Sequence, residues 1–182
     1  HRDLHVRSRR QRQMCIRDSD MTDTEDDTTT VVVGNGELEV SLSATTPEGM
    51  DITKDAKAVN VLEIDVTAGN EDVSITGLEL ERTGFGSAAA DQVAVFSKEG
   101  RVSKEKSFNS DDVANVTFSP AFVVKAGETQ TLTVRVNVGG EGEFAVKVNE
   151  MSSSANVELG MLEGNTFDAK DTEAAVLEVK NE

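Results

Sequence analysis

Apolar and polar residues alternate along most of the chain from Val31 onward, and glycine-containing turns separate the alternating stretches. A period of two is typical of β-strands that bury one face and expose the other. The pattern is found in residues 37–43, 58–67, 72–82, 92–97, 113–119, 129–138 and 143–150, with shorter candidates at 156–159 and 174–179. Short strands at this spacing predict an all-β protein with the fold of an antiparallel, immunoglobulin-like β-sandwich.

Two local irregularities refine this prediction. In residues 72–82 the apolar positions change parity around Gly77, which predicts a β-bulge there. Residues 87–92, SAAADQ, favour one short helical turn, and no other stretch shows a helical period. No apolar run approaches the roughly 18 residues that a membrane-spanning helix needs, so we expect no membrane span in this sequence.

The predicted core consists of the inward-facing aliphatic residues of these strands, together with the phenylalanines. Each such side chain contributes about 1.5–3 kcal/mol when it is buried. In residues 37–43 we expect Leu38, Val40 and Leu42 to face inward. All seven phenylalanines are expected in the core: Phe85, Phe96, Phe108, Phe118, Phe122, Phe144 and Phe167. Such a core lets the domain fold without a metal or a disulfide.

The chain of 182 residues is strongly acidic, with 34 Asp and Glu against 18 Lys and Arg and a formal net charge of −16. Proteins that bind nucleic acids or anionic membranes need clustered basic residues, so we expect neither class of partner. Lysines that lie at sheet edges protect those edges against misassembly, and the candidates are Lys54, Lys57, Lys104 and Lys106.

Residues 1–19 differ from the rest in composition. They contain six Arg, both His, the only Cys and two Asp, a net of +4, which leaves −20 for residues 20–182. The run QRQMCIRDS at positions 11–19 closely resembles translated sequencing-adapter read-through, so we interpret residues 1–19 as a non-native basic segment. A genuine basic arm is the alternative. On the first interpretation the natural N-terminus, with any signal peptide, lies outside this fragment.

Residues 20–182 contain no His and no Cys. This composition excludes Ser-His-Asp and Cys-His catalysis and the usual zinc, copper and iron sites. A glycosidase would need a sugar cleft, which is usually lined by Trp or Tyr, and the chain has neither residue. We therefore expect a protein that is not an enzyme and has no catalytic residues.

Calcium is the one cofactor that this composition allows, because Ca²⁺ is bound by oxygen ligands in loops. Five candidate ligands lie in the acidic, threonine-rich stretch 20–30 and in the loop before Val113: Asp26, Asp27, Asn109, Asp111 and Asp112. Neither cluster has the spacing of an EF-hand loop. The alternative is that both clusters are solvated surface and that no cofactor binds.

A short internal repeat gives information about the C-terminal end of the chain. Leu38-Glu39-Val40 recurs as Leu177-Glu178-Val179, and a Thr- and Asp-rich segment precedes each copy. This repeat indicates the start of a second, tandem module. Two alternatives stay open: residues 174–179 form an edge strand of the same domain, or they pair with a neighbouring chain. Residues 20–33 are a second candidate for strand donation, which would make the chain a fibre subunit.

Residues 31–167 resemble an immunoglobulin-like surface module that is common in candidate-phylum (Patescibacteria) bacteria. The resemblance rests on EDVSITGLELERTGFGSAAADQVAVFSKEG from Glu71 onward, on KSFNS and ANVTFS, and on FVVKAGETQTLTVRVNV ending at Val138. Gly164-Asn165-Thr166 is similar to the motif that closes the module before its next repeat. Residues 87–90 depart from the family, because they are alanine-rich where the family usually has Asp. The resemblance implies a tandem domain of a secreted, S-layer-like or adhesin-like protein without catalytic residues.

These observations predict an acidic linker at residues 20–30, a sandwich at 31–167, and a linker followed by a next repeat or an edge strand at 168–182. The expected function is that of a non-catalytic, extracellular structural or adhesive module on the cell surface. Its expected partners are neighbouring modules or subunits. The alternative is a carbohydrate- or calcium-binding accessory module of a secreted enzyme, with glycans as partners, although the absence of Trp and Tyr argues against sugar binding.

Overall fold

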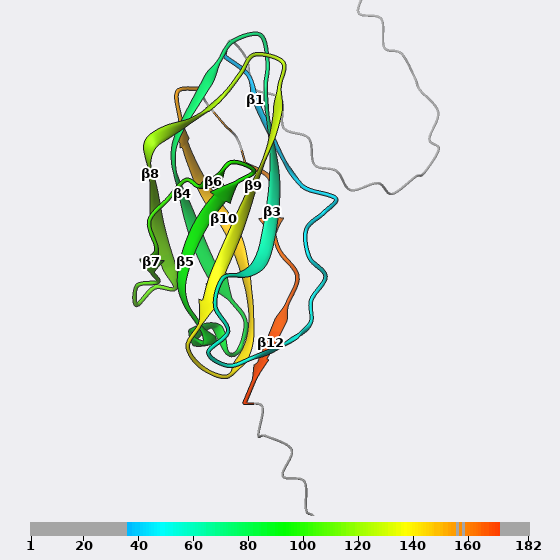
Figure 1. The fold of residues 1–182 in the computed structure, drawn as a ribbon, viewed down its shortest axis with the longest axis vertical. Helices are drawn as coiled ribbons and strands as arrows, with labels where there is room; N and C mark the ends of the chain where they lie inside the picture. The colour runs from blue at the N-terminus through cyan, green and yellow to red at the C-terminus, as the bar shows by residue number, and fades with distance from the viewer. Residues whose placement is uncertain (1–35, 156, 158, 172–182) are drawn as a thin grey trace, which may run out of the picture.

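The computed structural model describes residues 36–155, 157 and 159–171, and it confirms the predicted fold class. Two β-sheets pack face to face as an immunoglobulin-like β-sandwich whose strands run along the long axis of the molecule (Figure 1). A 3₁₀ turn, η1 (Ser87–Ala89), lies where the sequence predicts one short helical turn. The described residues include no helix that is long and apolar enough to cross a membrane.

The first sheet has the strand order β1-β3-β9-β5-β6, and β7 also pairs with β5. Its strands are β1 (Leu38–Leu42), β3 (Val59–Ala68), β9 (Thr129–Val138), β5 (Ala90–Ser97), β6 (Gly100–Arg101) and β7 (Lys106–Ser107). All pairs in this sheet are antiparallel. The four longest strands lie where the alternation of apolar residues predicts them.

The second sheet has the strand order β2-β12-β10-β4-β8, and β11 also pairs with β10. Its strands are β2 (Asp51–Thr53), β12 (Phe167–Lys170), β10 (Gly142–Ser153), β4 (Val73–Thr83), β8 (Val113–Val124) and β11 (Leu162–Glu163). The pair β2–β12 is parallel, and the other pairs are antiparallel. This exception arises because the chain reaches β2 by crossing over from the first sheet and not through a hairpin.

The inward-facing side chains of both sheets fill the space between them, as the alternation predicts. In β3, for example, Leu62, Ile64 and Val66 are fully buried. Phe144 of β10 and Phe167 of β12 are also fully buried, and their rings stack with centroids 6.1 Å apart. The core consists of aliphatic side chains, phenylalanines and Met151.

The core predictions are wrong for two residues. Leu42 is 42% exposed because it ends β1, where the chain leaves the sheet. Phe85 is completely exposed at the tip of the loop Gly84-Phe85-Gly86. That loop lies against the start of β10, where a Cβ on Gly86 would be 2.4 Å from the Cα of Gly142, and it holds the ring away from the core. Three further phenylalanines are only partly buried: Phe96, Phe108 and Phe122.

The predicted bulge in β4 is confirmed. Gly77 faces Ser152 of β10, whereas Ile75 faces the next residue, Ser153, so β4 has one extra residue, Thr76, at this step. A Cβ at Gly77 would lie 2.6 Å from the carbonyl oxygen of Val116 in β8. Glycine at this position therefore permits the close approach of the two backbones.

The alternation misses β2, β6, β7, β11 and β12 because they are too short to show a period of two. β12 continues the second sheet to Lys170, so the sandwich extends beyond residue 167, where the sequence places its end. Val157 and Leu159 of the predicted strand 156–159 lie outside strands and pack against the core. The remaining residues of that strand, and all of residues 174–179, lie outside the described part of the chain.

The sandwich has one closed side, formed by β1, β11 and β12 with the loop that joins β1 to β2. Here a Cβ on Gly164 would lie 2.5 Å from the carbonyl oxygen of Val61, so the two sheets approach each other closely. The side-chain nitrogen of Asn165 donates a 2.9 Å hydrogen bond to the carbonyl of Pro47 in the covering loop. Opposite lies the open side, formed by β6, β7 and β8, where a bridge between Ser103 and Phe118 joins the two sheets.

Candidate functional site

The loop of residues 109–112 holds three of the five predicted calcium ligands. The side-chain oxygen of Asn109 accepts two 2.9 Å hydrogen bonds, from the backbone N–H groups of Asp111 and Val113. Asp112 has a positive φ of 61°, and its N–H donates to the carbonyl of Asn109. The oxygen of Asn109 thus closes the turn before β8, which is a common role of Asn in loops.

Asp112 also has a partner from a distant part of the sequence. Its carboxylate accepts a 2.6 Å hydrogen bond from Nε of Arg82, and a second guanidinium nitrogen of Arg82 donates to the carbonyl of Ala90. The guanidinium lies over the ring of Phe108, 5.2 Å from its centroid. Because Arg82 is largely buried, this network joins β4, β5 and the loop before β8. Asp112 therefore has a structural role in this structure.

The described residues contain no group of three or more His, Cys, Asp and Glu side chains that could hold a metal ion. Asp26 and Asp27 lie outside the described residues, so the structure does not place them beside Asn109, Asp111 and Asp112. Calcium binding accordingly stays a prediction from the sequence.

The outer face of the first sheet is covered by polar side chains that bind one another. Thr131 donates a 2.6 Å hydrogen bond to the carboxylate of Asp65, and Thr45 donates one of 2.6 Å to Glu63. Arg135 lies over the ring of Phe96, 4.3 Å from its centroid. This face is a layer of cross-strand polar pairs, which stabilise antiparallel sheets.

The second sheet carries a similar polar layer around Glu81. Asn149 donates a 2.8 Å hydrogen bond to the carboxylate of Glu81, and Lys147 lies 3.2 Å from the same group. These two partners, Asn149 first, lower the pKa of Glu81 below its usual value. The carboxylate therefore stays ionised through the physiological range and acts as a fixed charge on this face.

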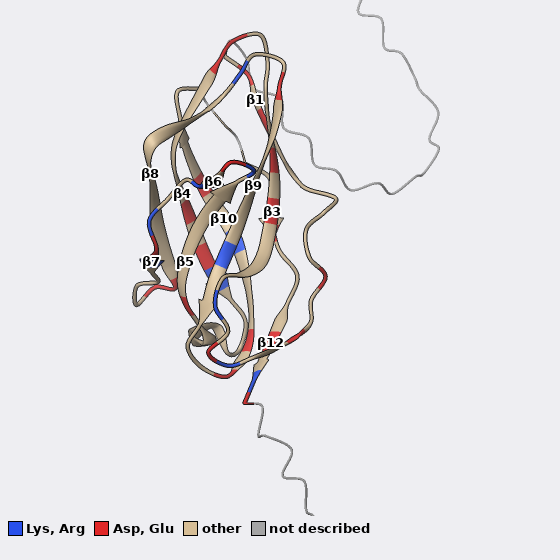
Figure 2. Ribbon diagram, viewed as in Figure 1, with Lys and Arg blue, Asp and Glu red and all other residues tan. Residues whose placement is uncertain are grey.

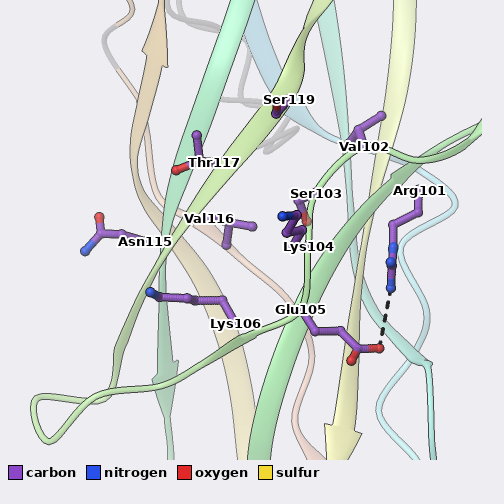
Figure 3. A pocket seen from close by; sticks show the side chains of 10 residues that line it. All are labelled: Arg101, Val102, Ser103, Lys104, Glu105, Lys106, Asn115, Val116, Thr117 and Ser119. Atoms are coloured by element: carbon purple, nitrogen blue, oxygen red, sulfur yellow. Dashed lines mark ion pairs between the residues drawn. The ribbon is translucent and has the colours of Figure 1, made fainter.

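A hollow on the described surface lies on the open side. It has a volume of about 560 Å³ and runs between the chain segment 101–106 and the edge strand β8 (Figure 3). A second hollow of about 510 Å³ shares Arg101, Val102 and Ser119 with it and continues along β8 to Val123. We call the two together the β8 groove. Both parts are open surface hollows, lined by polar and apolar side chains.

Segment 101–106 is held in place by β5. The N–H groups of Val102 and Ser103 both donate to the carbonyl of Val95, over 3.0 and 3.3 Å. In return, the buried hydroxyl of Ser103 accepts a 2.8 Å hydrogen bond from the N–H of Val95. Ser103 then bridges to Phe118 of β8. This residue therefore sets the wall of the β8 groove, although nothing in the sequence distinguishes it from other serines.

The β8 groove carries a positive charge on an otherwise acidic molecule. Residues 98–106, KEGRVSKEK, contain four basic and two acidic residues. Arg101 pairs with Glu105 over 3.7 Å, as the dashed line in Figure 3 shows. Lys104 and Lys106 are exposed, and neither makes an ion pair with a described residue. Figure 2 shows blue segments together with red ones near β6 and β7, and further blue segments on β9 and β10.

No protein-family model and no curated protein matches the chain. Three solved structures are weakly similar to it. A family 123 glycoside hydrolase from Clostridium perfringens is 8% identical with a TM-score of 0.42, over 74% of this chain and 27% of that chain. The seventh ScaB type I cohesin from Pseudobacteroides cellulosolvens is 11% identical with a TM-score of 0.38, over 74% of this chain and 95% of that chain. AvmM, which catalyses macrocyclization in alchivemycin A biosynthesis, is 7% identical with a TM-score of 0.39, over 82% of this chain and 99% of that chain.

This chain therefore spans a minor part of the glycoside hydrolase. At such identities and TM-scores, the three structures do not indicate what this chain binds or does.

Proposed function

We propose that this chain is a non-catalytic structural or adhesive module of an extracellular, cell-surface protein, and that it transmits tension along its length. The module would space its neighbours in a longer chain and would have those neighbouring modules or subunits as partners. The proposal is supported by a continuous apolar core, by polar outer faces whose side chains pair with one another, and by the open form of the two hollows of the β8 groove.

The observation that carries the proposal is where the chain enters and leaves the sandwich. The described chain starts beside the β3–β4 turn, where the N–H of Gly69 donates to the carbonyl of Glu37. It ends beside the β9–β10 turn, where Lys54 lies 3.0 Å from Asp171 and 3.6 Å from Glu141. Figure 1 shows these two points at opposite ends of the long axis. Modules joined in this way would lie end to end.

This arrangement also determines how tension would act on the terminal strands. β1 runs from the entry end toward the exit end beside β3, and β12 runs toward the exit end between β2 and β10. Tension between the two ends would slide each strand along its neighbour. The hydrogen bonds of a pair then resist together, whereas bonds at the end of an unzipping pair break one after another.

Single-molecule force spectroscopy tests the proposal. In a Cys15→Ser background, the full chain is tethered through cysteines added at its two termini and stretched. The control is tethered at the N-terminus and at Asn70→Cys, in the exposed turn beside the start of β1. That geometry unzips β1 from β3. We expect a clearly higher unfolding force through the termini, because forced unfolding follows the unfolding rate of the loaded contacts.

An unfolding force through the termini that is equal to or below that of the Asn70 geometry would contradict the tension-bearing role.

A further inference from the structure

We propose that the β8 groove of one copy of this protein binds residues 20–33 of a second copy, which add a strand to the outer edge of β8. This inference goes beyond the proposed function, because a module that transmits tension does not need to associate with its own copies. It is carried by three observations: an incomplete sheet edge, unpaired positive charge beside that edge, and an acidic segment of matching chemistry elsewhere in the chain.

The edge is that of β8, the last strand in the order of the second sheet. Its inner edge pairs with β4, whereas its outer edge is bound by the described chain at two places: the bridge between Phe118 and Ser103, and Val113, whose backbone N–H and carbonyl both bond to Asn109. Pro120 lacks an N–H group, so it ends the part of β8 that could pair further. Residues 114–117 therefore offer backbone donors and acceptors to a short added strand, which is a known mode of peptide recognition.

The charge is that of Lys104 and Lys106, which line the β8 groove beside Asn115 and Thr117 (Figure 3). Exposed lysines commonly protect free edges. Here, however, the two lysines belong to a chain whose residues 20–182 carry a net charge of −20. Acidic segments are therefore the most abundant charged partners that a second copy of the chain provides. Lysines at an edge repel a basic strand, and they attract a strand that carries carboxylates.

Residues 20–33, DMTDTEDDTTTVVV, have the required chemistry. They contain five acidic residues and no basic residue, followed by Thr and Val, which favour the extended conformation. Thr28 to Val33 would supply the added strand, and the carboxylates before it, such as Asp26 and Asp27, would lie within reach of Lys104 and Lys106. Asp26 and Asp27, two of the five predicted calcium ligands, would thereby have a protein partner.

The occupant belongs to a second copy because of the topology. Residue 36 continues into β1, and β1 lies at the edge of the first sheet that faces β11. β8 contacts β5 and β7, at the opposite edge of that sheet. The segment before residue 36 therefore starts on the closed side, whereas the β8 groove lies on the open side.

Analytical ultracentrifugation of the full chain tests this inference at low and high salt. We expect concentration-dependent association that weakens as salt is added, because the contact is made by exposed charges. The double variant Lys104→Glu/Lys106→Glu should weaken association on the order of tenfold. Asp26→Lys/Asp27→Lys should do the same, and combining the two pairs should restore association. Lys57→Glu is the matched control, since Lys57 is exposed and lies in the loop between β2 and β3, away from the groove.

Cross-linking identifies the occupant. In the Cys15→Ser background, chains with Thr29→Cys are mixed with chains with Thr117→Cys under oxidising conditions. A disulfide-linked heterodimer supports the inference. A chain that stays monomeric at every concentration, or an association that Lys104→Glu/Lys106→Glu leaves unchanged, overturns it. A chain that carries both Thr29→Cys and Thr117→Cys and forms only an intrachain disulfide also overturns the inference, because the segment then occupies the groove of its own chain. None of these outcomes changes the force measured through the termini, so the two proposals fail separately.

Discussion

The two lateral sides of the sandwich differ in how the two sheets are joined and in how charged groups are paired. On the closed side, the β1–β2 loop packs on Gly164-Asn165-Thr166, and the charged groups at the chain exit pair within the domain. Lys170 lies 2.8 Å from both Asp168 and Asp51, and these two carboxylates, Asp168 first, raise the pKa of its ammonium group. On the open side the Ser103–Phe118 bridge and the contacts of Arg82 join the sheets, and Lys104 and Lys106 have no ion pair with described residues.

This difference shows that the two edges have different roles. The closed side uses its polar groups to complete the fold, so changes there should alter stability. The open side leaves backbone groups and charges unpaired in the described chain, so changes there should alter association more than stability. The four predictions that follow test this division, from the largest expected effect to the smallest.

The largest effect is expected for Phe167→Ala on the closed side. Phe167 is fully buried and stacks on Phe144, so the substitution removes a large core side chain and leaves a cavity. We expect the free energy of unfolding to fall by about 3–5 kcal/mol. Urea denaturation of the full chain measures it, with Phe85→Ala as the matched control, because the exposed Phe85 should change stability by no more than about 0.5 kcal/mol. Equal effects of the two substitutions would contradict the core assignment.

Gly164→Ala should be the next largest. Its Cβ would lie 2.5 Å from the carbonyl oxygen of Val61, on a backbone that cannot easily move. We expect a loss of about 1–3 kcal/mol, as for other overpacked sites. Gly140→Ala serves as the control, since its Cβ would lie 3.7 Å from the nearest atom, an ordinary contact. If Gly164→Ala unfolds at the same urea concentration as the control, the closed side is less tightly packed than described.

Ser103→Ala tests the bridge between the sheets on the open side. The substitution leaves the N–H of Val95 without its 2.8 Å side-chain acceptor in a buried position. We expect a loss of about 1–3 kcal/mol, together with weaker self-association, because the wall of the β8 groove is released. Ser119→Ala, on an exposed position of the same groove, should leave stability within about 0.5 kcal/mol of the parent chain. A Ser103→Ala chain as stable as Ser119→Ala would show that the bridge contributes little.

The smallest effect concerns pH. Lys125 donates a 2.6 Å hydrogen bond to Asp72, and the N–H of Ala126 donates one of 3.0 Å, so the pKa of Asp72 lies below its usual value. A carboxyl group with a lowered pKa stabilises the fold above its unfolded pKa and loses that contribution as pH falls through its folded pKa. The difference in stability between the parent chain and Asp72→Asn should therefore be present at pH 7 and shrink in acid.

A double-mutant cycle with Lys125→Met checks the cause of that pH dependence. In the Lys125→Met background, Asp72→Asn should have a smaller effect at pH 7 and a weaker pH dependence. An effect of Asp72→Asn that is the same at pH 7 and in strong acid would mean that its charge does not matter.

The sequence predicts the long strands well because their apolar residues alternate over many positions. Thr129–Val138 and the parity change at Gly77 are both found as predicted. Strands of two to four residues, such as β11 and β12, carry too few positions to show alternation. Phe85 is misassigned for a related reason. Its hydrophobicity predicts burial, but the glycines on both sides place it in a loop whose direction depends on contacts with Gly142.

The candidate site was only partly predictable. The sequence places carboxylates and an amide at residues 109–112, but not the guanidinium of Arg82, which is 30 positions away and binds Asp112. It also identifies Lys104 and Lys106 as edge residues, but not the β8 groove beside them, because the groove forms between two segments that meet only through the bridge between Ser103 and Phe118.

The sequence by itself thus determined the fold class, most strands, the bulge and the acidic character of the molecule, because these depend on local periodicity and composition. The tertiary structure decided which side of the sandwich is closed, which charges are paired, and where a free edge lies beside positive charge. Those properties depend on contacts between residues far apart in the chain, and such contacts are set by the packing of the two sheets and not by any local pattern.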